Sequence, residues 1–478
     1  MRSTDYTPPM PLLVGSTGIA IFMGVLDGSV VNISLVTIAR FFDVSMQEVR
    51  WISLAYLVAI TAFLVFAGKL GDRYGNKLIF QSGFLIFGLG SLLCALAWTL
   101  PLLVAARIIQ AVGAAATTAN GIALITHFTT TENRGRAIGL NSLIVAIALS
   151  IGPFVGGFMT EYFGWQSIFL INVPLSIVGF ICVQRIVPSS QQAPLIVSLD
   201  ILGTLLFGSA LSSFIIGLTM LRNAVTTPMA PILIFFSLVL VALFIPWEQH
   251  HQNPILDFSI LTDRRILFGL VCATIAYTSL NSISFLVPFY YQDIRDLSPT
   301  ETGFMILAMP ICMSLIGPLA GYLSEKHNAR ILSSVGLIGL SLACLSLVTL
   351  SPSTSFIFLI IVAGSAGGAM ALFTSPNSNS IMSATPKEKL GLVGGFIGLA
   401  RNIGFTIGIT LSSSMFILLI DYKNPTDIAN HVYAEALGLT FFFFGCIALL
   451  GVFFSAIRGS DRIKETKTIP SSIVKGRC

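Results

Sequence analysis

Charged side chains are scarce in this sequence: they make up 10% of its 478 residues, whereas hydrophobic side chains make up 55%. Water-soluble domains carry about 25% charged residues, so a soluble fold would leave much apolar surface in water. Lipid is therefore predicted to be the solvent for most of the chain. Apolar runs of about 20 residues, the length that crosses a bilayer core of about 30 Å, recur from one end to the other.

The sequence also lacks the patterns of most catalytic and cofactor sites. It contains no GxxxxGK[ST] phosphate-binding run, no H-E-x-x-H metal pair and no CxxC pair. Its five histidines fall at span ends or in loops, and its seven cysteines lie almost entirely within apolar runs, as packing residues do. We therefore expect no enzyme activity, no metal and no cofactor, with an intramembrane enzyme as a remote alternative. Without a nucleotide-binding run, energy for any active process would come from a gradient or a partner.

Cutting the chain at charges, Pro/Gly clusters and polar loops predicts an all-α polytopic membrane protein with fourteen transmembrane helices, because open strands cannot span lipid. The first apolar run is too long for a signal peptide and carries an acid in its middle, so it is predicted to span the membrane. The predicted spans are 11–39, 48–67, 78–99, 102–126, 137–160, 166–187, 200–220, 230–247, 266–291, 302–323, 331–351, 355–376, 391–419 and 437–457.

The distribution of Lys and Arg predicts the orientation. An even number of spans places both termini on one side, and with cytoplasmic termini nineteen cations lie inside, two lie within spans and five lie outside. This bias is typical of cytoplasmic loops, so the net charge of +5 requires no nucleic-acid partner. Short loops favour a prokaryotic cytoplasmic (inner) membrane. The five outer cations are Arg40, Arg50, Arg222, Arg295 and Lys423.

Weak internal symmetry indicates a carrier, because carriers are commonly built from repeated helix bundles. The segment Gly68–Lys77 after the second span is similar to Gly317–Lys326 after the tenth. The predicted organisation is an N-terminal six-helix bundle (1–187), an inserted two-helix region with flanking loops (188–265), a C-terminal six-helix bundle (266–457) and a basic cytoplasmic tail (458–478).

Asp27 is the carboxylate that lies well inside a predicted span. A charge at the bilayer centre costs at least about 2.5–3.5 kcal/mol, so such residues usually face a wet cavity and have a function. Burial favours the protonated form, and a carboxyl whose proton affinity changes with exposure is what proton coupling requires. The alternative is a structural acid held by Ser29, Asn32 or Arg107.

Arg107 begins a polar stripe in the fourth span, followed at helical spacing by Gln110, Gly113 and Thr117. The arginine would pair with deprotonated Asp27 or with an anionic group and release it on protonation. The alternative is an arginine whose charged end reaches back to the membrane surface.

Two glycine-containing segments are candidates for moving parts. In the first, glycines that permit close backbone approach alternate with charges, as in a latch or an ordinary membrane anchor; its residues are Gly68, Gly71, Asp72, Arg73, Gly75 and Lys77. In the second, small residues and a proline suit either a hinge or generic tight packing; its residues are Gly152, Pro153, Gly156 and Gly157.

Other polar residues within the spans are candidates for lining a cargo cavity. For each one singly, a hydrogen bond between helices is at least as good an interpretation. These residues are Asn32, Gln110, Thr117, Asn120, Tyr277, Asn281, Ser284 and Arg401.

Together these motifs resemble the major facilitator superfamily, and the inserted helix pair resembles its fourteen-helix drug/proton antiporter branch. The segment 26–32 is similar to a signature whose acid, here Asp27, is implicated in coupling or cation recognition. The resemblance implies that Arg107 takes part in proton transfer, that Asp72 and Arg73 help latch a cytoplasmic gate, and that Gly152–Gly157 is the antiporter motif.

The function expected from this resemblance is proton-coupled antiport, exporting hydrophobic or cationic drugs or related small molecules by alternating access. The expected partners are a small-molecule substrate, protons and the lipid bilayer. A metabolite or vitamin carrier of the same superfamily is the alternative, because a family relationship identifies an architecture and not a cargo. A non-transporting membrane sensor is a remote alternative. Cargo identity, oligomeric state and any accessory partner are left open.

Overall fold

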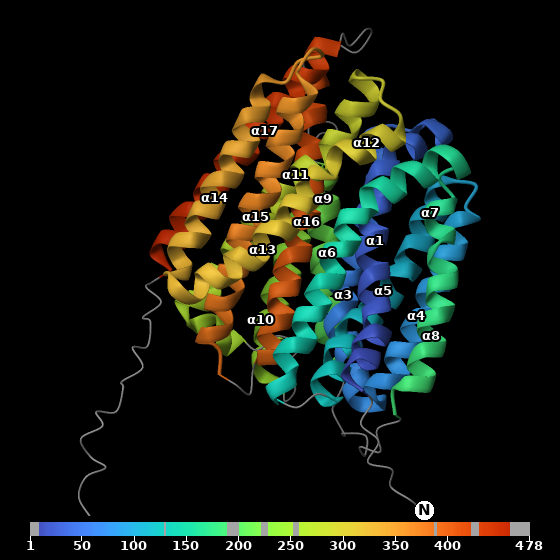
Figure 1. Cartoon of the computed structure of the whole chain (residues 1–478), viewed down its shortest axis with the longest axis vertical. Coiled ribbons are helices and arrows are strands. Elements are labelled where there is room, and N and C mark those ends of the chain that lie inside the picture. The colour runs from blue at the N-terminus through green and yellow to red at the C-terminus, as the bar shows by residue number, and fades with distance from the viewer. Residues whose placement is uncertain are drawn as a thin grey trace, which may run out of the picture.

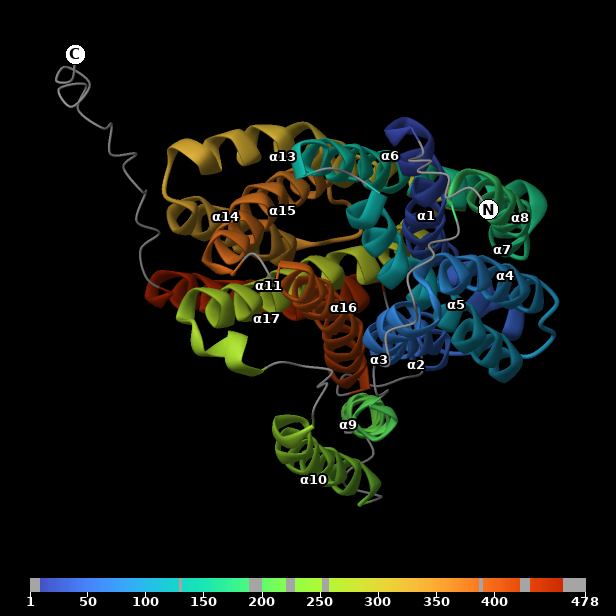
Figure 2. The same ribbon diagram turned by 90° about the horizontal axis from the view of Figure 1, so that it is seen from below.

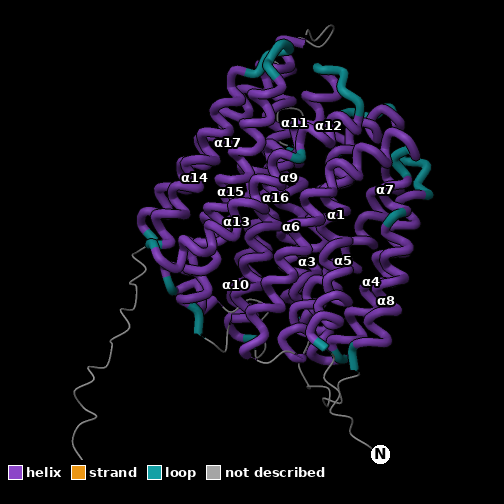
Figure 3. Tube along the Cα trace, in the orientation of Figure 1, coloured by secondary structure: helices purple, strands orange, loops and turns teal. Residues whose placement is uncertain are grey.

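The fold was analysed in a computed structural model, which describes residues 9–128, 131–188, 200–220, 228–251, 258–386, 390–421 and 430–458. Within these ranges the chain is helical, with short turns and loops and no strand (Figure 3). The predicted all-α class is therefore confirmed. The basic tail predicted for 458–478 lies outside the described residues except for Arg458.

Seventeen α-helices make up the described chain, and they fall into three sets along the sequence. The first set is α1 (Met10–Phe42), α2 (Met46–Val49), α3 (Trp51–Tyr74), α4 (Asn76–Ala95), α5 (Leu100–Phe128), α6 (Thr131–Phe163), α7 (Ser167–Leu170) and α8 (Asn172–Ile186). A pair follows, α9 (Ile201–Thr219) and α10 (Met229–His250). The last set is α11 (Arg264–Phe289), α12 (Pro299–Ile306), α13 (Ala308–Lys326), α14 (Ala329–Ser346), α15 (Phe356–Ala384), α16 (Leu390–Asp421) and α17 (Asn430–Ile457).

Thirteen segments of the described chain are helical, long enough and apolar enough to cross a membrane. Each coincides with a predicted span. The span predicted at 137–160 lies in α6, a 33-residue helix that is not among the thirteen. The chain is thus a multi-pass membrane protein.

One sequence-based boundary is wrong, and one confirmed span contains an internal turn. The charged segment Gly68–Lys77 was predicted to be a loop, but α3 remains helical through Tyr74 and α4 begins at Asn76. The turn is confined to Gly75, whose φ of 97° is a conformation that glycine adopts without a Cβ clash. The predicted span 302–323 is divided into α12 and α13 by a turn at Leu307.

Figure 1 shows the helices running between two ends of the molecule, and we call the end where α1 begins the lower end and the end where it finishes the upper end. From below, helices α1–α8 form a first group and α11–α17 form a second group beside it (Figure 2). The pair α9 and α10 lies at the margin, with α9 against α3 and α16.

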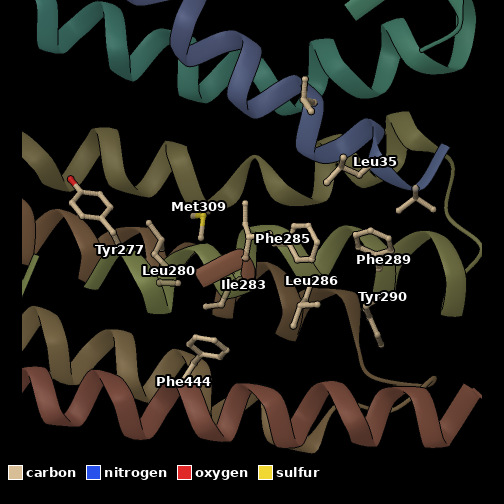
Figure 4. Close-up of a cluster of buried hydrophobic side chains, with 14 of the residues drawn as sticks. Leu35, Tyr277, Leu280, Ile283, Phe285, Leu286, Phe289, Tyr290, Met309 and Phe444 are labelled. Carbon is tan, nitrogen blue, oxygen red and sulfur yellow. The ribbon is translucent and has the colours of Figure 1, made fainter. Parts of the chain in front are cut away.

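The two groups are joined by contacts in their upper halves. Apolar side chains of α1 and α11 meet there, with Leu35 close to Phe285 and Phe289 (Figure 4). Polar contacts follow the same pattern: Arg40, at the end of α1, forms an ion pair of 2.8 Å with Asp293, just after α11. The upper boundary between the groups is therefore closed.

Several glycines in the lower half and middle of α1, α13 and α16 border unfilled space. A Cβ added at any of them would meet no heavy atom within 4 Å; they are Gly15, Gly24, Gly28, Gly317, Gly321, Gly395 and Gly398. The contacts between the two groups described above thus lie in their upper halves, whereas these glycines of the lower half and middle have no close neighbour.

Candidate functional site

Asp27 lies in the middle of α1 with 1% of its surface exposed, and its carboxylate accepts hydrogen bonds from three side chains. Arg107 Nη1 lies 2.6 Å from Oδ2, while Gln110 Nε2 and Asn172 Nδ2 each lie 2.9 Å from Oδ1. Arg107 and Gln110 are on α5, and Asn172 is the first residue of α8. The acid therefore joins three helices of the first group.

Close packing of α4 on α5 completes this cluster. Arg107 and Gln110 are three residues apart and so share one face of α5. Gly90 of α4 lies directly against the backbone of Gln110, where a side chain would collide. This approach brings Ser91 within 2.8 Å of Gln110 Nε2, which donates to its hydroxyl. The amide of Gln110 thus donates to both Asp27 and Ser91.

The guanidinium of Arg107 is held by more than its ion pair. Its Nε donates to the carbonyl of Ile52 at 3.2 Å, and its charged carbon lies 4.2 Å from the ring centre of Tyr56 and 5.7 Å from that of Phe169. Aromatic faces attract cations, most strongly away from water. Because Arg107 is only 1% exposed, the interpretation that its charge reaches the membrane surface is wrong.

The arrangement makes Asp27 and Arg107 interdependent. Two charges taken out of water are stabilised mainly by each other and by the hydrogen bonds that complete them. Adding one proton to the carboxylate would cancel its charge and leave an unpaired guanidinium, which remains charged under all ordinary conditions. The chemistry available here is proton uptake and release coupled to the fate of an ion pair.

The side chain of Asp27 is directed at α5 and α8, within the first group. Its neighbours Gly24 and Gly28 border unfilled space, and Gly24, three residues before Asp27, lies on the same side of α1. The carboxylate itself is closed off by its partners, with 1% of the residue's surface exposed.

The predicted latch segment is held within the first group. Gly71 lies so close to Asn120 of α5 that a Cβ would overlap the amide, and Asn120 Nδ2 donates to the carbonyl of Ala67 at 3.0 Å. Lys77 Nζ donates to the carbonyl of Gln184 at 3.3 Å. These bonds fasten the lower ends of α3 and α4 to α5 and α8.

Asp72 and Arg73, the charges predicted to latch a gate, make no ion pair among the described residues. Asp72 is exposed, and Arg73 lies over the ring of Tyr74 at 5.4 Å. Gly68 approaches only Ala119 of its own group. Among the described residues, neither Asp72 nor Arg73 bonds to the second group, so these two charges do not hold the groups together at the lower end.

The Gly–Pro segment of α6 contacts two helices at once. Gly152 lies against Ser29 and Gly156 against the backbone of Val30, both on α1. On the other side, Gly157 meets the backbone of Pro299 in α12, where a Cβ would overlap. The small residues therefore let α6 lie between α1 of the first group and α12 of the second.

Pro153 shares this boundary, because its carbonyl would overlap a Cβ added at Gly303 of α12. Two glycines on opposite helices, Gly157 and Gly303, thus bring the backbones of α6 and α12 into direct contact. This segment forms part of the closed upper boundary.

Most residues predicted to line a cargo cavity are engaged by other parts of the protein. Thr117 Oγ1 donates to the Ala114 carbonyl at 3.1 Å, and Asn281 Nδ2 donates to the Phe405 carbonyl at 2.8 Å. Together with the bonds of Gln110 and Asn120 described above, these contacts favour the alternative of hydrogen bonds within and between helices. Their role in a cargo cavity stays a prediction.

Of three other candidates, Asn32 and Ser284 are half-buried and Tyr277 is buried. Asn32 accepts a bond of 3.4 Å from Ser53 and is half-buried. Tyr277 packs edge-on against Phe405, with ring centres 5.2 Å apart. Ser284 lines a small apolar pocket with Met309 and donates to the carbonyl of its own helix at Leu280.

Arg401 is exposed although it lies eleven residues into α16, roughly 16 Å from the start of the helix. The opposite face of α16, with Phe396 and Leu399, packs into a cluster that includes residues of α10 and α11. Gly398, on the same face as Arg401, borders unfilled space. A charge at this depth is expected to face water, and Arg401 is exposed on the same side of α16 as Gly398.

Sequence reasoning missed Asn172, Ser91 and Tyr56 as members of the Asp27 cluster. Asn172 is 145 residues away from Asp27 in the sequence, and none of the three missed residues belongs to a motif that would pair it with an acid. The available signal was polarity: an amide and a serine inside apolar spans need partners. A search for partners of each buried polar residue could have proposed them, without choosing among them.

The family model of the Major Facilitator Superfamily matches residues 17–409 and 266–474. Among curated proteins, the riboflavin transporter RibZ of Clostridioides difficile (strain 630) is 31% identical over 434 residues, covering 91% of this chain and 94% of that protein. The multidrug resistance protein Stp of Mycobacterium tuberculosis (strain CDC 1551 / Oshkosh) is 28% identical over 438 residues, covering 88% of this chain and 80% of that protein.

Solved structures with the same fold include a D-xylose-proton symporter, with a TM-score of 0.66, 14% sequence identity and coverage of 93% of this chain and 96% of that one. The xylose transporter XylE from E. coli, in a partially occluded inward-open conformation, has a TM-score of 0.62 and 13% identity, with coverage of 95% and 98%. At these identities the likeness shows the fold alone.

Proposed function

The chain belongs to the Major Facilitator Superfamily, and we propose that it is a proton-coupled antiporter of the fourteen-helix branch that exports hydrophobic or cationic small molecules by alternating access. Membership makes it a membrane transporter, and its relatives are transporters and not enzymes. Its similarity to multidrug resistance proteins supports export of such compounds. The observation that carries the proposal is the buried ion pair between Asp27 and Arg107.

In the proposed coupling step, a proton binds one carboxylate oxygen of Asp27, and the neutral acid no longer balances Arg107. The guanidinium then needs a new position or water, because an unpaired buried charge is strongly unfavourable. Since the two residues lie on α1 and α5, relief of this imbalance would shift those helices relative to each other. Loss of the proton restores the pair and the original arrangement.

The sealed position of Asp27 gives it a proton-binding role rather than a cargo-binding one. Its partners occupy both oxygens, and only 1% of its surface is exposed. Cargo would act at a distance, by favouring one arrangement of the helix groups over the other.

We infer that the lower end faces the cytoplasm and that both termini lie there, in a prokaryotic inner membrane. The excess of Lys and Arg in the loops predicted at that end supports this orientation. Under it, α9 and α10 are the inserted pair between two six-helix bundles, and the Gly68–Lys77 segment belongs to a cytoplasmic gate.

The test uses purified protein in liposomes with an imposed proton gradient and a dye that reports internal pH. Addition of lipophilic cations should trigger proton movement by the wild-type protein. The Asp27→Asn variant should lose this response, because it cannot exchange a proton at the site. The double variant Asp27→Asn/Arg107→Gln also removes the unpaired charge of Arg107. It therefore provides a site that cannot bind a proton, even if the single variant folds poorly.

Asp43→Asn is the matched control, because Asp43 ends the same helix but is exposed. Its φ of 51° is one that asparagine tolerates. A response retained by Asp43→Asn and lost in both Asp27 variants supports antiport through Asp27. A response retained in the Asp27 variants rejects it.

A second candidate function is transport of a neutral or anionic metabolite. RibZ, at 31% identity over 91% of the chain, is a riboflavin transporter, and Arg401 is an exposed positive charge within α16. A cationic group in a cargo cavity repels cationic cargo and favours anions or polar neutral rings. The same liposomes, challenged with riboflavin in place of lipophilic cations, distinguish the two candidates by which compound moves protons or is itself accumulated.

A further inference from the structure

One buried arginine joins three parts of the protein at the upper end. Arg50 lies between α2 and α3, with 3% of its surface exposed. Its Nη1 donates to the hydroxyl of Ser413 and, at 3.1 Å, to that of Ser414, both on α16 of the second group. Its Nη2 donates to the carbonyl of Thr219 at 3.4 Å, at the last residue of α9.

The chemistry of these contacts fits a connection that can open. Ser413 donates its own hydroxyl proton to the carbonyl of Ile409 in α16, which leaves its lone pairs to accept from Arg50. The acceptors of Arg50 are neutral, and among the described residues no carboxylate lies within ion-pair distance of it. A guanidinium buried without a counter-charge gives up hydration that separation of the groups would restore.

The opposite end of α9 is also linked to α3. Lys69 of α3 lies close enough to Asp200, at the start of α9, and to Glu248, near the end of α10, for their charges to act on it. With Arg50 bound to Thr219 above, α9 is fastened to α3 near both ends. The pair α9 and α10 therefore contacts both groups: α9 lies against α3 and α16, and Phe244 of α10 packs with Phe396 of α16. Arg50 adds a polar link between this pair and α3 at the upper end.

We propose that Arg50 is a polar clamp of the closed upper gate, holding α16 of the second group to both α3 and the α9–α10 pair. It acts by position and does not touch cargo. The ion pair across this end, Arg40–Asp293, has side chains 61% and 31% exposed, so water screens it. A second buried polar bond crosses the same boundary, from Gln292 Nε2 to the Ile33 carbonyl at 3.0 Å, but it joins α1 and not α16. The inference assumes that the two groups separate at the upper end, as alternating access requires, but it needs neither a proton site nor a particular cargo.

The test measures distances between spin labels in the full chain, freed of native cysteines and reconstituted in lipid nanodiscs without cargo or gradient. One label pair, at Asp43 and Ser353, spans the two groups at the upper end. A second pair, at Asp43 and Met229, spans the first group and the upper end of α10. All three positions are exposed. Arg50→Ala should shift both distance distributions toward longer values.

Two further variants make the result specific. Ser413→Ala/Ser414→Ala removes the acceptors on α16 and keeps the bond to Thr219, so it should lengthen the Asp43–Ser353 distance and leave Asp43–Met229 unchanged. It also serves if Arg50→Ala does not fold.

Arg295→Ala is the matched control, because this outer arginine bonds only within the second group, to the Thr354 carbonyl at 2.6 Å and to Tyr290 at 3.3 Å. It should leave both distances unchanged. Unaltered distributions in the Arg50 and serine variants, or equal shifts in Arg295→Ala, would overturn the proposal. Because the measurement contains no cargo and no gradient, its outcome is independent of whether Asp27 couples protons.

Discussion

The first group of helices buries a pair of opposite charges at its centre, whereas the middle of the second group, in the part of the chain that the structure describes, is held by neutral polar bonds. Asp27 and Arg107 are each 1% exposed in the first group. In the second, Thr278 Oγ1 donates to the Gly404 carbonyl at 3.1 Å and Asn281 Nδ2 to the Phe405 carbonyl at 2.8 Å. Both kinds of contact join helices, but they respond differently to protons.

A neutral hydroxyl-to-carbonyl bond does not change between pH 5 and 8. A carboxylate paired with arginine, in contrast, loses its own negative charge when it takes up a proton, and the arginine is then left without a counter-charge. Helix packing in the second group is therefore fixed by shape and small residues: Gly404 and Gly408 lie directly against the backbone of α11. The asymmetry places the group that the proposed function would protonate in the first group of helices, whereas the contacts described in the middle of the second group are neutral.

The largest loss of stability is expected when the acid of the buried ion pair, Asp27, is replaced. Asp27→Asn leaves Arg107 charged and unpaired, and removing one partner of a buried pair costs about 3–5 kcal/mol. Arg107→Gln should cost less, because the remaining carboxyl can take up a proton and become neutral, which the guanidinium cannot do. Thermal unfolding of the purified variants in detergent measures both.

The double variant Asp27→Asn/Arg107→Gln keeps two amides that can hydrogen-bond and should recover part of the stability lost in Asp27→Asn. An Asp27→Asn protein as stable as the wild type would show that the pair is not a charged one, and the contrast between the two groups would disappear.

A smaller effect is expected at the boundary where the two groups touch. A side chain at Gly303 would overlap the Pro153 carbonyl, so Gly303→Val should force α12 from α6 at a cost of about 1–3 kcal/mol. The matched control is Gly321→Val in α13, where a Cβ meets nothing within 4 Å and the change should stay within about 0.5 kcal/mol. Equal shifts in apparent Tm for the two variants would contradict the contact.

A neutral bond in the second group should contribute less again. Asn281→Ala removes the bond to Phe405 and should cost about 1 kcal/mol, as typical hydrogen bonds between membrane helices do. Ser284→Ala is the control, because the bonds of Ser284 are long and weak: 3.4 Å to the Leu280 carbonyl of its own helix and 3.7 Å to Met309 Sδ. A loss at Asn281 as large as that in Asp27→Asn would mean that the two groups do not differ as described.

Much of this architecture could be predicted from sequence, because lipid restricts the choices. Apolar length alone identified spans that coincide with the thirteen membrane-length helices. The cost of a charge in lipid singled out Asp27, and helical spacing placed Arg107 beside Gln110. Pairing of Asp27 with Arg107 was among the alternatives, and the structure brings the two together.

What sequence could not supply are contacts between distant segments. Asn172 reaches Asp27 only because α8 packs beside α1, and no local pattern encodes that. Glycines and charges made Gly68–Lys77 look like a loop, yet close contact between Gly71 and Asn120 lets α3 continue as a helix to Tyr74. That the two groups meet in their upper halves could not be predicted either, since one sequence serves both conformations of a carrier.

A second buried acid, outside both groups, sharpens the comparison further. Asp200 is 2% exposed at the start of α9, where its Oδ1 accepts bonds from the Gly203 amide at 2.7 Å and from Trp247 Nε1 at 2.9 Å. Burial alone would raise the pKa of Asp200, but the bonds from Trp247 and Gly203 outweigh it and hold that pKa below its usual range, and His251, whose Nδ1 lies 4.0 Å from Oδ2, lowers it further. Hydrogen bonds from neutral donors thus contribute more to keeping Asp200 charged than its more distant ionic partner does, unlike the close ion pair of Asp27.

Asp200→Asn should therefore have the smallest effect, about 0.5 kcal/mol at neutral pH, because asparagine caps a helix about as well as aspartate and only the charge is lost. Because the folded pKa is lowered, the stabilisation from the carboxylate is present above the unfolded value of about 3.9 and is lost as pH falls below it. The difference in apparent Tm between wild type and variant should accordingly be constant from pH 8 to 5 and shrink toward pH 3. If the difference instead grows on acidification, Asp200 is held in its protonated form, and the bonds from Trp247 and Gly203 do not keep it charged.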